Sequence, residues 1–452
     1  MAKVYVIIAA CFLFLFAACK DQLIIPPVYH QTVFLDTVLV EPTEVDLHLA
    51  TSDSVHSGST LFQIRRDSVI IFSRVVQQKD TVIVDTGLLP SHVYRYKALR
   101  FTDSVKTDSS KPLSLRTMDT TSHDFTWEVD TIGDGNNSIL RDVAIVNDTL
   151  VYAVGEFYLR DSTGQFDPLL YNLAKWNGRE WSLRRVSIPF RGFTITPALY
   201  GIFAFSQNQI WLTGGLAIYG DGNNWTTCDV RLITGFDSLS FTKCWGATPS
   251  DMYFVGLHGG IAHYDGTTWQ KQESSTDVDL TDVCGSPDGS IVWTCGFKEC
   301  CPGTFLFRNI GNGWQLVRDG SSLEFTIKSD SLSGTFTSIY ANSSKKVYVC
   351  SSAGIYEASS KTIGEAKRLS FTSSWFPGFP NRLRGNGVND FAIVGDYAMI
   401  AHYNGSTWRY FSQLRGDNER LTGLSQSGNL VVAVGIITDP INSHGLVFIG
   451  RR

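Results

Sequence analysis

The chain has little charge and no excess of basic residues. Only 18% of its 452 residues are charged, and 38 Lys and Arg face 43 Asp and Glu, which gives a formal net charge of −5. A protein that binds nucleic acid through its phosphates needs a basic surface, so this balance argues against that class. Hydrophobic residues make up 43% of the chain, which excludes a disordered polypeptide and supplies enough apolar material for large cores.

The sequence also lacks the short motifs that carry common chemistries. It contains no Gly-rich phosphate loop, no His-Glu-x-x-His zinc motif and no Gly-x-Ser-x-Gly nucleophile elbow. We therefore predict no catalytic residues, no cofactor and no metal site from motifs. Forty Gly and eleven Trp instead predict many turns and many large buried anchors.

No hydrophobic run at the N-terminus is long enough to span a bilayer with ease. Val4–Ala18 is an unbroken apolar run of fifteen residues after Lys3, whereas a spanning helix needs about 20. This pattern is typical of a secretory signal. The following Leu15-Phe16-Ala17-Ala18-Cys19 resembles a bacterial lipobox, which implies a signal peptide over residues 1–18 and a lipid on Cys19.

Lys20 and Asp21 follow the predicted lipidated cysteine. A Lys and an acidic residue at these places resemble the surface-export signal of Bacteroidetes lipoproteins, which implies an outer-membrane protein held at the cell surface through its lipid. The alternative is an ordinary signal peptide in which Cys19 has no role. Residues 19–33 contain Pro26 and Pro27 and are expected to be a tether.

Residues 34–117 alternate between short strand-like runs and turn-rich segments. Period-two alternation marks residues 45–49, 61–64, 81–84 and 93–98, which predicts a β-sandwich. Leu88 to Tyr94 resembles the fibronectin type III signature, in which a Leu-x-Pro turn precedes a tyrosine that bonds to the backbone upstream. The resemblance implies a fibronectin type III-like domain with Tyr94 as that tyrosine, and with Leu47 or Leu49 in place of the usual core Trp.

The remainder of the chain, residues 125–452, contains an internal repeat. Residues 251–269 align with residues 390–408 without a gap, from an Asp to a Trp 18 positions later in both copies. Looser copies share a strand that ends in Val-Gly or a related pair, and five carry Asn-Gly or Asp-Gly before the next strand. We interpret each copy as a four-stranded meander whose Asn/Asp-Gly pair forms a two-residue type I′ turn.

Seven such copies predict a seven-bladed β-propeller, and the fold class is therefore all-β. The last copy ends at Phe448–Arg452 without a Trp strand, whereas Phe125–Val129 supplies one at the start of the region. Pairing of these two segments would close the ring without a free edge. The pattern resembles the Trp-repeat propellers of bacterial surface lipoproteins.

Several histidines, aspartates and arginines could bind a metal or a carboxylate, but their positions in the repeat favour other roles. His263 and His402 occupy one repeat position, so we expect a structural role rather than metal binding, and Asp251 and Asp390 are expected to cap backbone groups. For the arginines before three first strands, solvent exposure is preferred over a carboxylate clamp near the channel; they are Arg141, Arg382 and Arg420.

Seven cysteines lie between Cys228 and Cys350, and most read as small buried residues. Cys244, Cys295 and Cys350 fall at core positions of the repeat. Cys300 and Cys301 lie in an insertion, where a disulfide to Cys228 is preferred over a metal site with Cys295.

The long insertions all fall at one end of the predicted blades, in the connections between strands two and three and between blades. Loops on one side of a rigid scaffold commonly bind ligands. The aromatic residues that we select as candidate ligand-binding residues are Tyr158, Phe193, Trp375, Phe376 and Phe379. The alternative is that such side chains pack against the blades; it carries equal weight at residues 375–379 and is preferred elsewhere, as at Phe157 and Phe190.

These observations predict a lipid-anchored envelope protein that binds polysaccharide or protein without catalysis. Its expected partners are the membrane, through the lipid, and that ligand. The alternatives are a glycan-active hydrolase or lyase with a site in the channel, and an assembly factor for other envelope proteins. The identity of the ligand and the oligomeric state do not follow from the sequence.

Overall fold

The computed structural model describes residues 32–52, 60–76, 78–228, 230, 240–298, 303–319, 332–360, 366–370, 378–439 and 442–452. The signal peptide, Cys19 and nearly all of the predicted tether lie outside this part. Two compact units are present. The smaller contains Leu49–Thr81, Tyr96–Leu113 and residues before Asp36, and the larger contains Asp36–His48, Val82–Arg95 and Ser114–Arg452.

Two antiparallel sheets form the N-terminal part of the described chain. The strands of the first, in pairing order, are β1 (Val33–Val40), β2 (Glu44–Thr51) and β5 (Asp80–Thr86). The second contains β4 (Val69–Val75), β3 (Thr60–Arg66), β6 (Val93–Thr102) and β7 (Val105–Ser109), and β8 (Leu113–Arg116) also pairs with β6. The four runs predicted from alternation all lie within these strands.

The predicted tyrosine contact is present in this region. The Leu89 backbone N–H donates a hydrogen bond of 2.9 Å to the Tyr94 hydroxyl. Leu47 and Leu49 are both buried, as expected for the residues that replace a core Trp.

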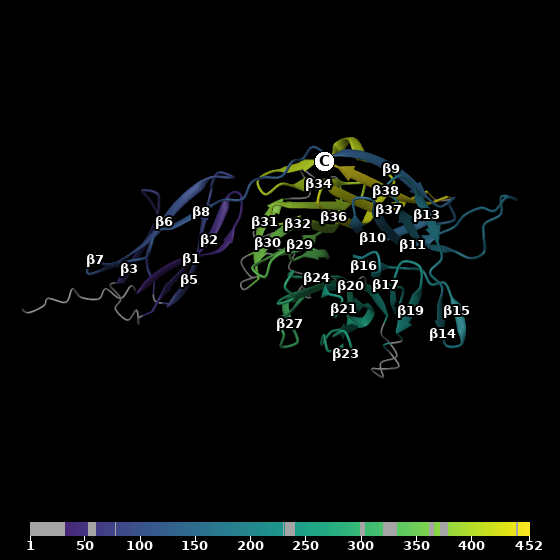
Figure 1. Cartoon of the computed structure of the whole chain (residues 1–452), viewed down its shortest axis with the longest axis horizontal. Helices are drawn as coiled ribbons and strands as arrows, with labels where there is room; N and C mark the ends of the chain where they lie inside the picture. Colours follow the sequence, from purple (N-terminus) through teal and green to yellow (C-terminus); the bar gives the residue numbers. More distant parts are fainter. Residues whose placement is uncertain are drawn as a thin grey trace, which may run out of the picture. The chain divides into compact units, whose positions relative to one another are not determined.

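Seven four-stranded sheets follow in the described residues, and we number them along the chain (Figure 1). Sheet 1 contains β10 (Ile139–Asn147), β11 (Leu150–Phe157), β12 (Tyr171–Trp176) and β13 (Trp181–Arg184). Sheet 2 contains β16 (Gly201–Ser206), β17 (Gln209–Thr213), β18 (Ala217–Gly220) and β19 (Trp225–Cys228). Sheet 3 contains β20 (Phe241–Thr248), β21 (Asp251–Gly256), β22 (Ile261–Tyr264) and β23 (Trp269–Gln272).

Sheet 4 contains β24 (Asp279–Gly285), β25 (Val292–Phe297), β26 (Thr304–Asn309) and β27 (Trp314–Asp319). Sheet 5 contains β28 (Phe336–Tyr340), β29 (Lys346–Ser351), β30 (Gly354–Ser359) and β31 (Lys367–Ser370). Sheet 6 contains β32 (Pro380–Gly387), β33 (Asp390–Gly395), β34 (Ile400–Tyr403) and β35 (Trp408–Tyr410). Sheet 7 contains β36 (Glu419–Ser427), β37 (Leu430–Ile437), β38 (His444–Arg451) and β9 (Thr126–Ile132).

Within the described connections between these strands lie a short hairpin and two 3₁₀ helices. A hairpin of β14 (Ile188–Phe190) and β15 (Phe193–Ile195) joins sheets 1 and 2. The short 3₁₀ helices η1 (Leu257–Gly259) and η3 (Ser412–Leu414) lie in sheet 3 and after sheet 6.

The sheets form a ring, because the first strand of each contacts the first strand of the next, and β36 of sheet 7 contacts β10 of sheet 1. Second strands such as β29 and β33 are buried along their whole length, since each sheet packs between two neighbours. This burial explains why these strands are runs of Val, Ile, Tyr and Ala rather than alternating sequences.

Bulges in the first strands join neighbouring sheets. One residue of the bulge is left out of the strand pairing, and in sheets 5, 6 and 7 its side chain bonds to a backbone carbonyl of the next sheet. Thr337 Oγ1 donates to Pro380 O at 2.7 Å, Asn381 Nδ2 to Leu421 O at 3.0 Å, and Thr422 Oγ1 to Leu140 O at 3.4 Å. The Thr422 bond crosses the point at which the ring closes.

The predicted closing strand is also present. β9 pairs with β38 in an antiparallel ladder in which Trp127 is opposite Gly450 and Val129 is opposite Phe448. A side chain on Gly450 would collide with the Trp127 ring, because a Cβ there would lie 2.7 Å from it. The Trp127 ring also packs against Phe411 of sheet 6 with 5.1 Å between centroids.

The predicted type I′ turns are wrong. Trp176 pairs with Trp181 and Tyr264 with Trp269, so four residues form each loop, and only the Gly has a positive φ, as at Gly266 (91°). Asp265 Oδ1 accepts hydrogen bonds from the backbone N–H groups of Thr267 and Thr268 at 2.9 and 2.7 Å. The first residue is therefore Asn or Asp because its side chain caps the loop, and not because it adopts a positive φ.

We predict that Trp127→Ala lowers the free energy of unfolding by about 2–3 kcal/mol, because it removes a half-buried ring from the closing strand. Val129→Ala on the same strand is the control; Val129 is 53% exposed, so its replacement should change stability by no more than about 0.5 kcal/mol. Urea unfolding of both variants measures the difference. Equal effects would show that closure does not depend on this ring.

Candidate functional site

A cluster of charged side chains occupies the middle of the ring. Each of the members paired below follows a bulge in a first strand and is opposite the residue that precedes the Gly of the Val-Gly or Cys-Gly pair in the second strand. These pairs include Asp142↔Val154, Lys243↔Val255, Asp282↔Cys295 and Arg382↔Val394. One repeat position therefore places an Asp in sheets 1 and 4, a Lys in sheet 3 and an Arg in sheet 6.

Asp282 is the centre of this cluster and has no solvent exposure. Its Oδ1 lies 2.6 Å from Arg382 Nη1 and 2.7 Å from Arg384 Nη2, both on β32. Its Oδ2 accepts bonds from the Ser338 hydroxyl at 2.6 Å and the Ile339 N–H at 3.0 Å. Burial alone would raise the pKa of Asp282, but the two guanidinium groups hold it well below its usual range.

A second ion pair joins sheets 1 and 3. Lys243 Nζ lies 2.7 Å from Asp142 Oδ2 and donates to the Tyr200 carbonyl at 3.0 Å. The corresponding position of sheet 2, which lies between them, is Gly201, opposite Thr213. Burial, together with repulsion from Arg382, lowers the pKa of Lys243 to about 8.

These contacts determine what the cluster can do. Both carboxylates already accept hydrogen bonds from cations, whereas a glycoside hydrolase needs a pair of carboxyl groups available to act on substrate. The cluster therefore fits a structural role that fixes the order of the sheets. Exposure of Arg382, which the sequence favoured, is wrong, because its charge is needed to neutralise Asp282. Arg420 is exposed as expected, and Arg141 is partly buried beside Glu156.

The repeated histidines contact the repeated aspartates. Nε2 of His263 lies 2.7 Å from Asp251 Oδ1, and Nε2 of His402 lies 2.7 Å from Asp390 Oδ1. The expectation of a structural role for the histidines agrees with these bonds. We expected the two aspartates to cap backbone groups. This is wrong for their Oδ1 atoms, which contact the histidine ring on the neighbouring strand.

A segment before β9 covers the pair in sheet 6. His123 Nδ1 lies 2.8 Å from His402 Nδ1, and Thr121 N–H donates to Asn404 O at 3.3 Å. A bond between two Nδ1 atoms requires one protonated nitrogen and one bare nitrogen. Burial and the nearby His402 lower the pKa of His123 to about 4, so the neutral ring is the form that fits.

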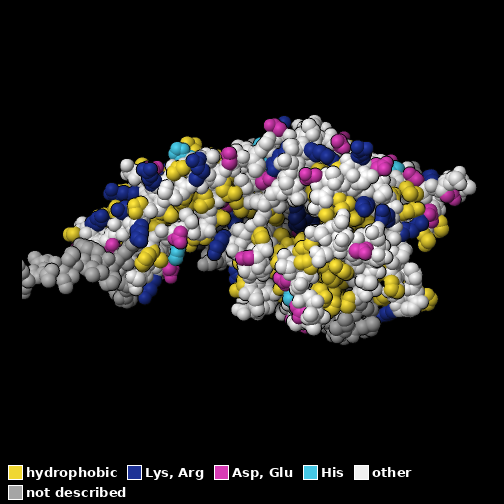
Figure 2. All heavy atoms as spheres, in the orientation of Figure 1, with side chains coloured by type: hydrophobic (Ala, Val, Ile, Leu, Met, Phe, Trp, Pro, Cys, Tyr) yellow, Lys and Arg dark blue, Asp and Glu magenta, His cyan; other side chains and the backbone are white. Residues whose placement is uncertain are grey.

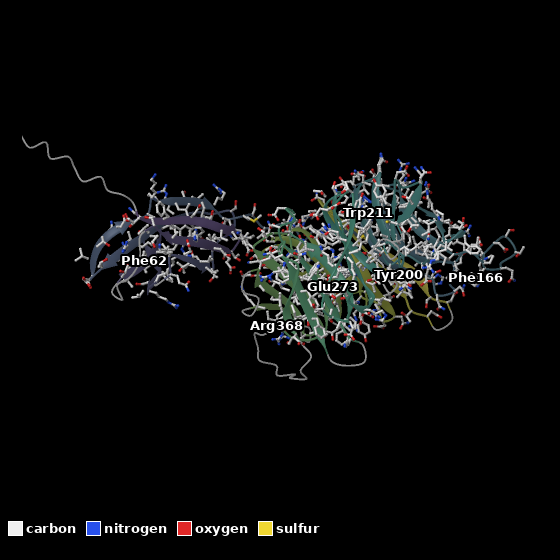
Figure 3. All side chains as sticks on the ribbon, turned by 90° about the horizontal axis from the view of Figure 1, so that it is seen from below. Phe62, Phe166, Tyr200, Trp211, Glu273 and Arg368 are labelled. Atoms are coloured by element: carbon white, nitrogen blue, oxygen red, sulfur yellow. The ribbon has the colours of Figure 1, made fainter. Side chains whose placement is uncertain are left out.

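Exposed hydrophobic side chains gather at the end of the ring that carries the long loops. Among the described residues of the ring, those that are both exposed and located in this set of loops are Leu169, Phe193, Tyr200, Leu257, Phe379 and Tyr397. The opposite set of turns contributes Ile310. We call the first set the long-loop face. Hydrophobic surface is visible in several places in Figure 2, and Figure 3 shows Phe166 on a loop that projects from the ring.

Arginines accompany several rings of the long-loop face. The Arg141 guanidinium lies 4.9 Å from the centroid of the Tyr200 ring, and that of Arg415 lies 5.9 Å from Tyr397. Asp396 N–H donates to Phe379 O at 3.0 Å, which places Phe379 beside the loop of Tyr397. Flat rings with adjacent cations suit sugar faces and protein side chains.

The five candidate residues have different outcomes. Phe193 is 75% exposed and Phe379 is 58% exposed, so packing of Phe193 against the blades, which the sequence favoured, is wrong. Tyr158 is half-buried, and Trp375 and Phe376 lie outside the described residues. Phe193 lies in the hairpin between sheets 1 and 2, whereas Phe379 precedes sheet 6.

Phe157 is buried and Phe190 is partly buried, as expected. Tyr200 and Tyr397 were not predicted from the sequence, although Tyr200 directly precedes a first strand and Tyr397 follows a Val-Gly pair.

One group of carboxylates in the described chain is close enough together to hold a metal ion: Glu41, Glu44 and Glu357, all in the larger unit. Lys346 Nζ lies among them at 2.7, 3.3 and 2.9 Å, so an ammonium group already occupies the position that an ion would take. Burial raises the pKa of Glu41 to about 7 despite this lysine.

The described cysteines behave mainly as core residues. Cys244, Cys295 and Cys350 are buried, as predicted, and so is Cys284. Burial raises the pKa of the Cys350 thiol to about 12, which suppresses thiolate chemistry. Cys300 and Cys301 lie outside the described residues, so the disulfide and the metal alternative at this insertion stay predictions.

Comparisons with known proteins support the fold. The structure of YCF48 bound to D1 peptide is similar over 74% of this chain and 98% of that chain, with 11% identity and a TM-score of 0.52. The WD40 propeller domain of Doa1 is similar over 72% and 97%, with 12% identity and a TM-score of 0.48. The similarity to YCF48, together with the ring of four-stranded sheets, supports a β-propeller within the larger unit.

Sequence comparisons reach less of the chain. No family model matches it. Immune protein Tsi7 of Pseudomonas aeruginosa is 31% identical over 105 residues, which are 22% of this chain and 31% of that protein. The chain thus matches about a third of the length of this curated relative. No helix in the described ranges is both long enough and apolar enough to cross a membrane.

We predict that Asp282→Asn lowers the free energy of unfolding by about 3–5 kcal/mol, because Arg382 and Arg384 lose the charge that neutralises them. Ser338→Ala, which removes a neutral hydrogen bond to the same oxygen, should cost only about 1 kcal/mol. Chemical denaturation at pH 7 compares the two. A similar cost for both would contradict a central role for the Asp282 charge.

We predict that acidification loosens the segment that contains His123. A histidine with a lowered folded pKa contributes stability that is complete above its ordinary pKa of 6.5 and is lost as the pH falls toward about 4. Amide exchange at Thr121, corrected for the intrinsic rate, should therefore accelerate from pH 7 to pH 4.5. In His123→Gln, the new side-chain amide can still form hydrogen bonds but does not titrate, so this acceleration should be smaller. An unchanged pH profile would refute the assignment.

Proposed function

We propose that this chain is a non-catalytic binding protein of the bacterial cell envelope, with polysaccharide or protein as its ligand. A lipid on Cys19 would anchor it to the outer membrane at the cell surface. A fibronectin type III-like domain over residues 34–117 would act as a spacer for a seven-bladed propeller over residues 125–452. The lipobox-like residues 15–19, the Tyr94 contact and the closed ring of sheets support these assignments.

The distribution of exposed hydrophobic side chains is the observation that carries the proposal. Six such residues belong to the long-loop face, and Ile310 belongs to the opposite turns. Exposed aromatic side chains cost free energy in water unless a partner covers them. This end also carries the long loops that can surround a ligand, and we therefore place the binding surface there.

The charges in the ring favour binding over hydrolysis. Asp142 and Asp282 are both neutralised at short distance, by Lys243 and by the two arginines of β32. A carboxyl group held in an ion pair cannot donate the proton that the general acid of a glycoside hydrolase must supply.

Replacement of Phe193 or Phe379 by Ala should weaken ligand binding about tenfold or more, because each removes a large exposed ring that a ligand would cover. The measurement is a glycan array, in parallel with capture of envelope proteins, using the chain without residues 1–19. Ile310→Ala on the opposite turns is the matched control and should bind as the parent does.

The two arms separate the ligand classes, and both depend on the same face. Binding that survives the Phe193 and Phe379 changes, or that Ile310→Ala weakens equally, would remove the long-loop face from the proposal.

A further inference from the structure

Sheets 3 and 6 hold two copies of one Asp–His pair, and the surroundings of the copies differ. Asp251 and His263 occupy the repeat positions of Asp390 and His402, and both pairs have the same 2.7 Å bond from Oδ1 to Nε2. Each Asp begins a second strand and each His lies in the third strand beside it. The two copies therefore present one carboxylate geometry at the short-turn end of the ring, opposite the long-loop face.

The copy in sheet 6 is filled by donors from the same chain. Arg452 is the last residue, and its Nη2 and Nη1 lie 2.5 and 3.0 Å from the two oxygens of Asp390. Asn386 Nδ2 donates to Asp390 Oδ2 and Gln426 Nε2 to Oδ1, both at 2.7 Å. Only 7% of the Asp390 side chain and 1% of the His402 side chain are exposed.

All three donors are missing from the copy in sheet 3. Asn386 lies four residues before its Asp, and Ala247 has that place in sheet 3. Gly423 of sheet 7 and Asp282 of sheet 4 occupy the same repeat position. Gln426 lies three residues after Gly423, and the residue three positions after Asp282 is Gly285. Arg452 directly follows Arg451, which pairs with Leu430 in sheet 7. The residue at the corresponding position of sheet 4 is Gly311, which has no side-chain donor.

These replacements leave the carboxylate of Asp251 accessible. Its side chain is 33% exposed and that of His263 is 17% exposed. Gly289 adds to the opening, because a Cβ at that position would lie only 3.0 Å from Asp251 Oδ2. A ligand can thus reach Asp251 Oδ2, the oxygen that does not bond to His263. In sheet 6 the corresponding oxygen, Asp390 Oδ2, bonds to the Arg452 guanidinium.

Aromatic rings lie near both copies, although they come from different repeat positions. In sheet 6 the Arg452 guanidinium lies 5.1 Å from the centroid of the Phe125 ring. In sheet 3 the Tyr253 ring packs on His263 with 4.4 Å between centroids, and the Trp314 ring lies 6.0 Å from Tyr253. These rings make the surroundings of the His263 side of the pair suitable for a planar cation.

We infer that Asp251 and His263 form a binding site for an arginine side chain of a partner protein. The guanidinium would form a charge-assisted pair with Asp251, as Arg452 does with Asp390. The C-terminal Arg452 of a second copy is not the donor, because it is already bound to Asp390 of its own chain. This site goes beyond the proposed function, since it lies at the other end of the ring from the long-loop face.

The test uses the pentapeptide Phe-Ile-Gly-Arg-Arg, the sequence of residues 448–452, with a fluorophore at its N-terminus. Fluorescence polarisation with the intact protein measures its affinity. The same peptide with citrulline at the last position keeps the shape and loses the charge, and should bind at least about tenfold more weakly.

Three variants locate the site. Asp251→Asn should weaken peptide binding at least about tenfold by removing the charge. Ala247→Asn restores the donor of sheet 6, which would compete with the peptide for Asp251, and should weaken binding while the charge is kept. Glu273→Gln is the control, because it removes an exposed carboxylate from the same sheet (Figure 3) and should leave the affinity unchanged.

The outcomes decide the inference without reference to the long-loop face. Selectivity for arginine over citrulline that is lost in both Asp251→Asn and Ala247→Asn supports it. No binding in the millimolar range, equal binding of the two peptides, or binding that Asp251→Asn does not change would overturn it. Thermal unfolding of each variant confirms that the fold is retained.

Discussion

The structure depends on closure of a ring whose sheets cannot bury their own faces. A four-stranded sheet on its own would leave apolar side chains exposed on both faces. Packing between neighbours buries the faces, and β9 pairs with β38 so that the first and last parts of the region share sheet 7. The bonds from Thr337, Asn381 and Thr422 then connect sheets 5, 6, 7 and 1 in turn around the ring.

Much of this fold could be predicted from the sequence, because the evidence for it is local. The gapless match of residues 251–269 with residues 390–408 defines a repeat, and the missing Trp strand at the C-terminus indicates where the ring closes. The type of the hairpin turn could not be predicted, since Asn-Gly and Asp-Gly serve both a two-residue turn and a four-residue loop. Only the pairing of Tyr264 with Trp269 distinguishes them.

The candidate sites were harder to predict because they depend on contacts between distant residues. Asp282 and Arg382 are 100 positions apart in the sequence and belong to sheets that are not neighbours, so nothing near Arg382 indicates that its charge is buried. The exposure of Phe193 has a similar origin, since it depends on a hairpin that stands between sheets 1 and 2. The open and the filled Asp–His pairs have similar local sequences. They differ at one position of their own first strand, Ala247 against Asn386, and in what the neighbouring sheet supplies.

The central ion pairs have a consequence for how such a wheel can change in evolution. Its backbone is nearly symmetric, but Asp282 must find its arginines two sheets further on, and Lys243 must reach Asp142 across the gap that Gly201 leaves. Sheets 1, 3, 4 and 6 thus carry charges whose partners lie on other sheets, and insertion or loss of a sheet between two partners would separate them. The order of these sheets is constrained by electrostatics as well as by packing.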